Sequence, residues 1–272
     1  MRMRTTWILV WSAVLCLAAT PASAQYGAKP MSDPATGESY HVEIGGYLWF
    51  PTPDILISSE ALGIVGSQID FVSDLGIEKT TFRQLKTVLR PGRKHRLRFE
   101  YTPISYDATG KLNTKIIFNG ITYPVTLPVT TELKWNAYRF AYEYDFIYRD
   151  RGFVGVVFDA KYTDVQATLS NIIDTEFVHA RAPIPTIGFI GRGYVAPNIS
   201  ITGELTGLGS GGLFGEDYRA HYIDFDLYGT VNFTDHFGAQ VGYRSLNVFY
   251  HLKHDEGDLD LRGLYFGGAF RF

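Results

Sequence analysis

The chain ends with Leu264-Tyr-Phe-Gly-Gly-Ala-Phe-Arg-Phe272, a stretch that alternates between two kinds of side chain. In an extended strand, successive side chains point to opposite sides. One side of this stretch would therefore carry small or polar residues, and the other would carry Leu264, Phe266, Gly268, Phe270 and Phe272. This pattern is typical of a strand in a wall between lipid and a polar lumen.

Similar alternation recurs upstream and predicts about ten strands. We expect them near residues 41–50, 80–89, 96–106, 134–148, 153–162, 177–194, 199–206, 220–233, 237–244 and 259–272. The segment 177–194 is the weakest, because Pro183 and Pro185 each remove a donor from the hydrogen-bond ladder. The terminal segment should pair with the first one, because a closed barrel leaves no exposed edge.

The connections between these segments alternate in length. Tight turns are predicted near Pro91, Asp150, Pro197 and Asp235, and most of the other connections are longer. Short periplasmic turns and long extracellular loops characterise outer-membrane barrels. The sequence therefore predicts an all-β fold, a closed antiparallel transmembrane β-barrel of about ten strands, with eight to twelve possible. The Asn119-Gly120 hairpin signal further predicts a β-ribbon within 107–133, and residues 67–77 could return the chain similarly.

The start of the chain has the features of a secretory signal. Arg2 and Arg4 precede the apolar run 7–19, and Ala22-Ser23-Ala24 supplies the small residues of a cleavage site. We expect a signal peptide over 1–24, a short flexible leader over 25–39 and a barrel domain over 40–272. The single cysteine, Cys16, lies inside the predicted signal, so the mature chain would have neither a thiol nor a disulfide.

Composition agrees with a membrane barrel and argues against some other classes. The formal net charge is −3, which lacks the basic excess of nucleic-acid-binding proteins. No apolar run beyond the predicted signal is long enough for a transmembrane helix. Aromatic residues make up 15% of the chain, and tyrosine and tryptophan favour membrane interfaces.

The candidate functional residues are charges on the predicted inward faces. They are Glu43, Arg98, Glu100, Arg139, Glu143, Asp145, Asp159, Lys161, Glu204, Asp224, Asp226 and Arg244. Three interpretations are open: they line a water-filled channel, they include catalytic carboxylates, or they form a mutually paired core in a narrow barrel. The paired core is suggested by the small diameter of the barrel, because about eight strands leave room only for packed side chains or one small ligand.

No motif on the chain indicates a defined chemistry. Asp224 and Asp226 share one face of a predicted strand, where Arg139 and Arg244 are candidate partners. The stretch 251–260 gathers histidines and carboxylates but lacks the spacing of a calcium loop. We therefore predict no metal site, no cofactor, no catalytic residue and no enzymatic activity.

A resemblance to a known class adds to this interpretation. The signal, Gly46-Tyr-Leu-Trp-Phe-Pro51, Ile69-Asp-Phe-Val-Ser-Asp-Leu75 and the terminal Phe272 resemble those of bacterial outer-membrane barrels, in the small-barrel class that includes the OmpA and OmpW transmembrane domains. The resemblance implies a location in the outer membrane, contact with its lipid and lipopolysaccharide, and recognition of Phe272 by the barrel assembly machinery.

The class contains several functions, so the resemblance leaves the function open. We expect a structural barrel or a narrow pore for small solutes. The alternatives are an enzyme that acts on lipid or peptide at the extracellular rim, and a surface protein for binding or adhesion.

Overall fold

A computed structural model describes residues 35–58, 67–111, 115–118, 121–123, 128–171, 175–209, 218–252 and 255–272. The predicted signal peptide, the first part of the predicted leader and the Asn119-Gly120 pair lie outside the described residues.

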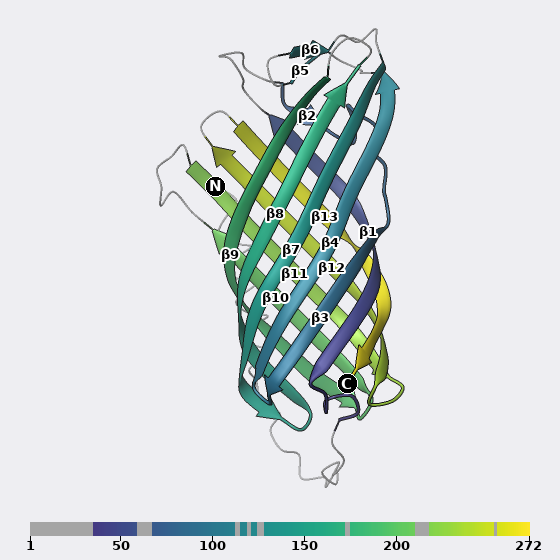
Figure 1. The fold of residues 1–272 in the computed structure, drawn as a ribbon, viewed down its shortest axis with the longest axis vertical. Helices are drawn as coiled ribbons and strands as arrows, with labels where there is room; N and C mark the ends of the chain where they lie inside the picture. The colour runs from purple at the N-terminus through teal and green to yellow at the C-terminus, as the bar shows by residue number, and fades with distance from the viewer. Residues whose placement is uncertain are drawn as a thin grey trace, which may run out of the picture. The chain divides into compact units, whose positions relative to one another are not determined.

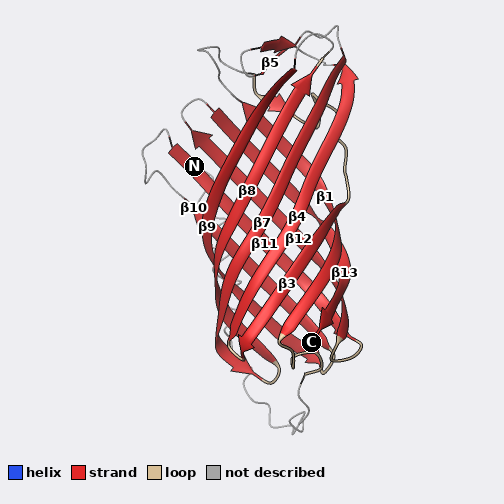
Figure 2. Ribbon diagram, viewed as in Figure 1, coloured by secondary structure: helices blue, strands red, loops and turns tan. Residues whose placement is uncertain are grey.

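Ten long strands form one closed antiparallel barrel, shown in Figures 1 and 2. They are β1 (Val42–Ser58), β3 (Phe82–Gly92), β4 (His95–Lys111), β7 (Pro128–Arg149), β8 (Gly152–Ser170), β9 (Thr175–Ala196), β10 (Ile199–Gly209), β11 (Tyr218–Asn232), β12 (Phe237–Leu252) and β13 (Asp255–Arg271). Each strand pairs with its neighbours along the chain, and all ten lie where the alternating pattern predicts a strand. The predicted fold class is confirmed.

The barrel closes between its first and last long strands. β1 pairs with β13 from Glu43, opposite Arg271, to Ser58, opposite Glu256. Past the end of β13, the Phe272 N–H donates to the Val42 carbonyl over 2.8 Å. This closure satisfies the backbone groups that an open sheet edge would expose to lipid, and it confirms the predicted pairing.

Most strands are longer than a bilayer requires. β7 and β9 each have 22 residues, whereas about 9–11 tilted residues cross the hydrocarbon layer. Pro183 and Pro185 lie inside β9, beyond Ile187, the last residue of β9 that pairs with β10. Within the described residues, one side of β9 has no pairing strand at the prolines, and an edge tolerates the missing donors.

Three short strands lie in the long connections at one end of the barrel (Figure 1). β5 (Ile116–Phe118) and β6 (Ile121–Tyr123) form the predicted hairpin, and the ribbon of 107–133 is built by β4 and β7 themselves, which pair as far as Lys111 and Pro128. β2 (Ile69–Asp70) pairs briefly with β1. The segment after β2 does not return as a hairpin, because its apolar side chains are buried in the barrel.

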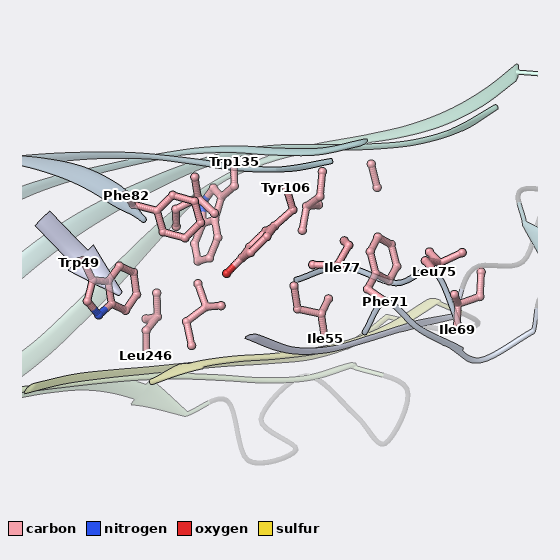
Figure 3. Packing of buried hydrophobic residues seen from close by; sticks show 14 of the residues in the cluster. Trp49, Ile55, Ile69, Phe71, Leu75, Ile77, Phe82, Tyr106, Trp135 and Leu246 are labelled. Carbon is pink, nitrogen blue, oxygen red and sulfur yellow. The ribbon is translucent and has the colours of Figure 1, made fainter. Parts of the chain in front are cut away.

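This segment packs into an apolar core in the half of the lumen nearest the long connections. Phe71, Leu75 and Ile77 join an inward-facing cluster that includes Trp49 and Tyr106 (Figure 3). In the figure, these side chains lie between strands above and below them. The lumen is therefore packed with apolar groups at this end, and its charged groups lie in the half near the short turns.

The outward faces form an apolar and aromatic surface around the barrel. Phe140, Phe266 and Phe270 are each more than half exposed. Aromatic rings pack across neighbouring strands, as in the stacked pair of Phe50 and Phe266 with centroids 5.5 Å apart. Exposed apolar area of this extent needs a lipid environment. Among the described residues, no helix is long and apolar enough to cross a membrane.

Candidate functional site

The inward faces of the strands bring charged side chains together in the half of the lumen near the short turns. All twelve charged residues predicted from the alternating pattern lie there. Because side chains of a strand alternate between its two faces, the strands that present phenylalanine and leucine to lipid present arginine and glutamate to the lumen. The structure thus places every predicted lumen residue on the predicted face.

The charges of this lumen cluster are balanced. Nine basic and nine acidic side chains of the described residues form its ion pairs. The basic residues are Lys86, Arg90, Arg96, Arg98, Arg139, Lys161, Arg192, Arg244 and Arg271, and the acidic residues are Glu38, Glu43, Glu100, Glu143, Asp145, Asp159, Glu204, Asp224 and Asp226. Buried charges require such partners, because desolvation of an unpaired charge is costly.

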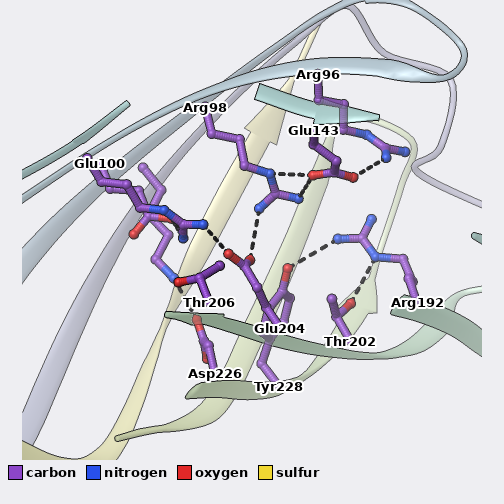
Figure 4. A network of polar contacts seen from close by, with 12 residues as sticks. Arg96, Arg98, Glu100, Glu143, Arg192, Thr202, Glu204, Thr206, Asp226 and Tyr228 are labelled. Atoms are coloured by element: carbon purple, nitrogen blue, oxygen red, sulfur yellow. Dashed lines mark hydrogen bonds and ion pairs between the residues drawn. The ribbon is translucent and has the colours of Figure 1, made fainter. Parts of the chain in front are cut away.

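Arg139 is the centre of one group. Its Nη1 lies 3.1 Å from Glu100 Oε1, its Nη2 lies 3.0 Å from Asp159 Oδ1, and it also contacts Glu204. Glu204 in turn pairs with Arg98, which connects this group to the next (Figure 4). One guanidinium thus contacts three carboxylates from three different strands.

Glu143 is the centre of the second group, closer to the short turns. Its two carboxylate oxygens accept hydrogen bonds from Arg96 and Arg98, each over 2.5 Å (Figure 4). Arg96 also pairs with Asp145, and its guanidinium lies 4.0 Å from the centre of the Phe153 ring. Glu143, Asp145 and Arg96 of this group are buried.

The two aspartates of β11 have different partners. Arg244 donates two hydrogen bonds to Asp224, over 3.0 and 2.8 Å, and Lys161 lies 2.7 Å from the same carboxylate. Asp226 instead accepts from Lys86 over 3.1 Å and from Tyr265 over 2.8 Å. Arg244 is therefore the partner of Asp224 that the sequence indicated, whereas Arg139 pairs with other carboxylates. Each aspartate serves as an ion-pair partner.

The end of the predicted leader closes the lumen at the short-turn end. Glu38 reaches into the barrel, where its carboxylate lies 2.8 Å from both Arg192 Nη1 and the Tyr194 hydroxyl, and 3.6 Å from Arg90. The backbone of the segment is fixed too, since Thr36 N–H donates to Pro197 O over 2.8 Å. We call residues 35–40 the N-terminal plug.

The electrostatics of the plug follow from its burial. Desolvation alone would raise the pKa of Glu38, but the charges of Arg192 and Arg96 and the hydrogen bonds from Arg192 and Tyr194 together lower its pKa. Burial raises the pKa of Tyr40 to about 12, because its phenolate would be desolvated beside Glu43. At neutral pH, the plug therefore inserts a charged carboxylate and a neutral phenol into the lumen.

A small cavity lies between some of these groups. A cavity of about 20 Å³ lies among Glu43, Lys86, Arg98, Glu204 and Asp226. This volume holds about one water molecule. Close ion pairs and a cavity of this size fit a paired polar core in a narrow barrel.

Six members of the lumen cluster are absent from the residues predicted as the site. Lys86, Arg96, Arg192 and Arg271 obey the same alternation and could have been found by extending it, as Arg96 lies two residues before Arg98. Arg90 directly precedes the turn predicted near Pro91, although its side chain is buried in the lumen. No pattern in the sequence predicts the inward position of Glu38, because that position depends on contacts with distant strands.

His95 Nδ1 lies 2.7 Å from the Tyr142 hydroxyl, and two further histidines lie beside carboxylates. His179 lies 2.6 Å from Asp164, and His251 lies 3.1 Å from Glu256, both on the outer surface of the barrel. Within the described ranges, neither histidine bonds to a hydroxyl or thiol that could act as a nucleophile. The same ranges contain no group of three histidine, cysteine or acidic residues that could hold a metal ion.

Comparisons with known proteins find similarity in the fold of solved structures. No protein-family model and no curated protein matches the chain. Among solved structures, the outer-membrane protease OmpT from Escherichia coli matches with a TM-score of 0.58 and 9% identity, covering 89% of this chain and 99% of that one. The chain is an outer-membrane β-barrel protein. The apolar outer surface of its closed barrel calls for a lipid environment, and the likeness to OmpT extends to the fold alone.

Other outer-membrane barrels match more loosely. The attachment protein Ail of Yersinia pestis has 8% identity and a TM-score of 0.37, covering 85% of this chain and 99% of that one. The toluene transporter TodX of Pseudomonas putida has 9% identity and a TM-score of 0.35, covering 89% of this chain and 92% of that one. One architecture can host many unrelated functions, so the barrel fold does not select a function.

Proposed function

We propose that this outer-membrane barrel is a sealed, structural barrel and not an open pore. The balanced lumen cluster carries the proposal, because nine bases and nine acids occupy the space that a conducting path would need. The cavity of about 20 Å³ among these charges holds about one water molecule, and apolar side chains of the core cluster pack in the opposite half of the lumen.

Electrical recording in planar bilayers tests the proposal. The purified mature protein should insert without producing stable unitary currents at neutral pH. Folding should be verified on the same sample by heat-modifiable migration on gels. Reproducible unitary currents that change in size when Glu204 is replaced by Gln would show that ions pass through the lumen cluster, and would contradict the proposal.

A narrow pore closed by the N-terminal plug is the second candidate. The observation in its favour is that Glu38 inserts into a ring of three arginines, Arg90, Arg96 and Arg192, at the short-turn end. Deletion of residues 35–40 distinguishes the two candidates. A sealed barrel stays silent after the deletion, because the groups around Arg139 and Glu143 still fill it, whereas a plugged pore conducts.

The enzyme and the surface-binding alternatives have less support. OmpT is a protease, but its likeness to this chain is one of fold. An enzyme would lose a hydrolytic activity when His179 or His251 is replaced, and a binder would lose its partner when residues 118–121 are deleted from an otherwise assembled barrel.

A further inference from the structure

The short-turn end of the barrel carries a group of basic residues outside the lumen. Arg93 and Lys94 lie in the turn between β3 and β4, and Arg149 and Arg151 lie at the turn between β7 and β8. All four are exposed, and Asp150 is the single acidic residue in these two turns. None of the four basic residues forms an ion pair with the described part of the chain, in contrast to the paired bases of the lumen.

The two turns lie next to each other and are held in place. β4 pairs directly with β7, with His95 opposite Tyr144. The Asp145 N–H donates to the Lys94 carbonyl over 2.9 Å, and Arg90 bridges the turns by donating to Tyr148 over 2.7 Å and to the Arg93 carbonyl over 3.3 Å. The four unpaired charges therefore form one basic patch.

An apolar groove lies on the lipid-facing surface of the same four strands. Its volume is about 540 Å³, and its outer lining includes Leu97, Phe99, Phe140, Phe158 and Ala160. Ala160 lies opposite Phe140 in the strand register, so a small side chain here leaves space between bulky ones. Leu97 is three residues from Lys94, which puts the groove about 10 Å from the basic patch along the strand.

We propose that the groove and the basic patch together bind one anionic phospholipid of the periplasmic leaflet. The acyl chains would lie in the groove, and the phosphate headgroup would contact Arg93, Lys94, Arg149 and Arg151. Short turns mark the periplasmic end of such barrels, so the patch lies at the headgroups of that leaflet. Charge complementarity selects an anionic headgroup, because each basic residue near the membrane raises the affinity for an anionic lipid surface about fivefold.

Native mass spectrometry after release from nanodiscs tests the proposal, with phosphatidylglycerol and phosphatidylethanolamine as probes. The wild-type barrel should retain one phosphatidylglycerol in preference to phosphatidylethanolamine. Replacement of Arg93, Lys94, Arg149 and Arg151 by Gln should lower that preference by about tenfold or more. A matched control replaces Lys79, Arg83 and Arg219, exposed bases toward the other end of the barrel, by Gln and should behave like wild type.

A second pair of variants tests the groove. Ala160→Leu should fill the groove and reduce retention of both lipids, whereas Ala239→Leu, on the lipid face of β12, should not. Both side chains point to lipid, so folding should persist and can be checked by heat-modifiable migration. Equal retention of the two lipids by wild type, or unchanged retention in Ala160→Leu, would overturn the proposal.

Discussion

Arg192 Nη1 donates a hydrogen bond to Glu38 Oε1 over 2.8 Å, although 154 residues separate the two in the chain. This contact fixes the N-terminal plug to β9 on the inner wall of the barrel. Glu38 in effect completes the charge balance of the lumen cluster at its periplasmic end, because Arg90 and Arg192 have no other ion-pair partner within the described ranges.

The plug should be stable at neutral pH and loosen in acid. The folded pKa of Glu38 lies below its usual value of 4.5, so its stabilising effect is fully present above about pH 4.5 and is lost as pH falls through the lowered pKa. Hydrogen exchange of residues 35–40 between pH 3 and 7 measures this. Relative to wild type, Glu38→Gln should exchange faster at neutral pH and lose the acid dependence; an unaltered acid dependence would assign the transition to another group.

Loss of Arg139 should strongly destabilise the barrel. The Arg139→Met variant would leave Glu100, Asp159 and Glu204 without their shared partner, and breaking such a buried pair costs about 3–5 kcal/mol. Urea unfolding in lipid vesicles, followed by tryptophan fluorescence, measures the loss. The exposed pair of Lys134 and Glu132 provides the control, and Lys134→Gln should change stability by less than about 1 kcal/mol.

Gly267 should be required at the seam where β13 pairs with β1 and closes the barrel. A Cβ atom there would overlap the Gly46 carbonyl and the Tyr47 ring, whereas a Cβ at Gly46, on the facing strand, would meet open space. Gly267→Ala should therefore lower the free energy of unfolding by about 1–3 kcal/mol, as overpacking does. Gly46→Ala should leave it nearly unchanged. Equal effects in the same urea assay would show that the seam tolerates a methyl group.

Phe272 should matter more for assembly in cells than for stability. Its side chain is 67% exposed toward lipid, while its backbone pairs with His41 and Val42. Phe272→Ala should therefore keep its stability in vesicles within about 0.5 kcal/mol, as for an ordinary surface substitution. The folded yield in the outer membrane should fall, because we propose that the aromatic end is the signal for the assembly machinery. A normal yield in cells would reject that role.

Local alternation predicted the strands but not their lengths. Val42, Ile44 and Leu48 mark the lipid face of β1 in the sequence, and the structure keeps them there. The same strand continues through Pro51 and Pro53 to Ser58, because β13 pairs with it throughout. In a sequence, a proline indicates the end of a strand. Only the structure shows that β13 lies beside β1 at these prolines and that the strand continues.

The sequence by itself determined the barrel and its two faces, because a strand's period of two is a local property that each segment carries alone. The tertiary structure decided how the inward charges meet. Arg139 could have paired with Asp224, yet barrel tilt and register place it against Glu100, Asp159 and Glu204. Which buried charges compensate one another depends on distances between strands far apart in the chain, and no local pattern contains those distances.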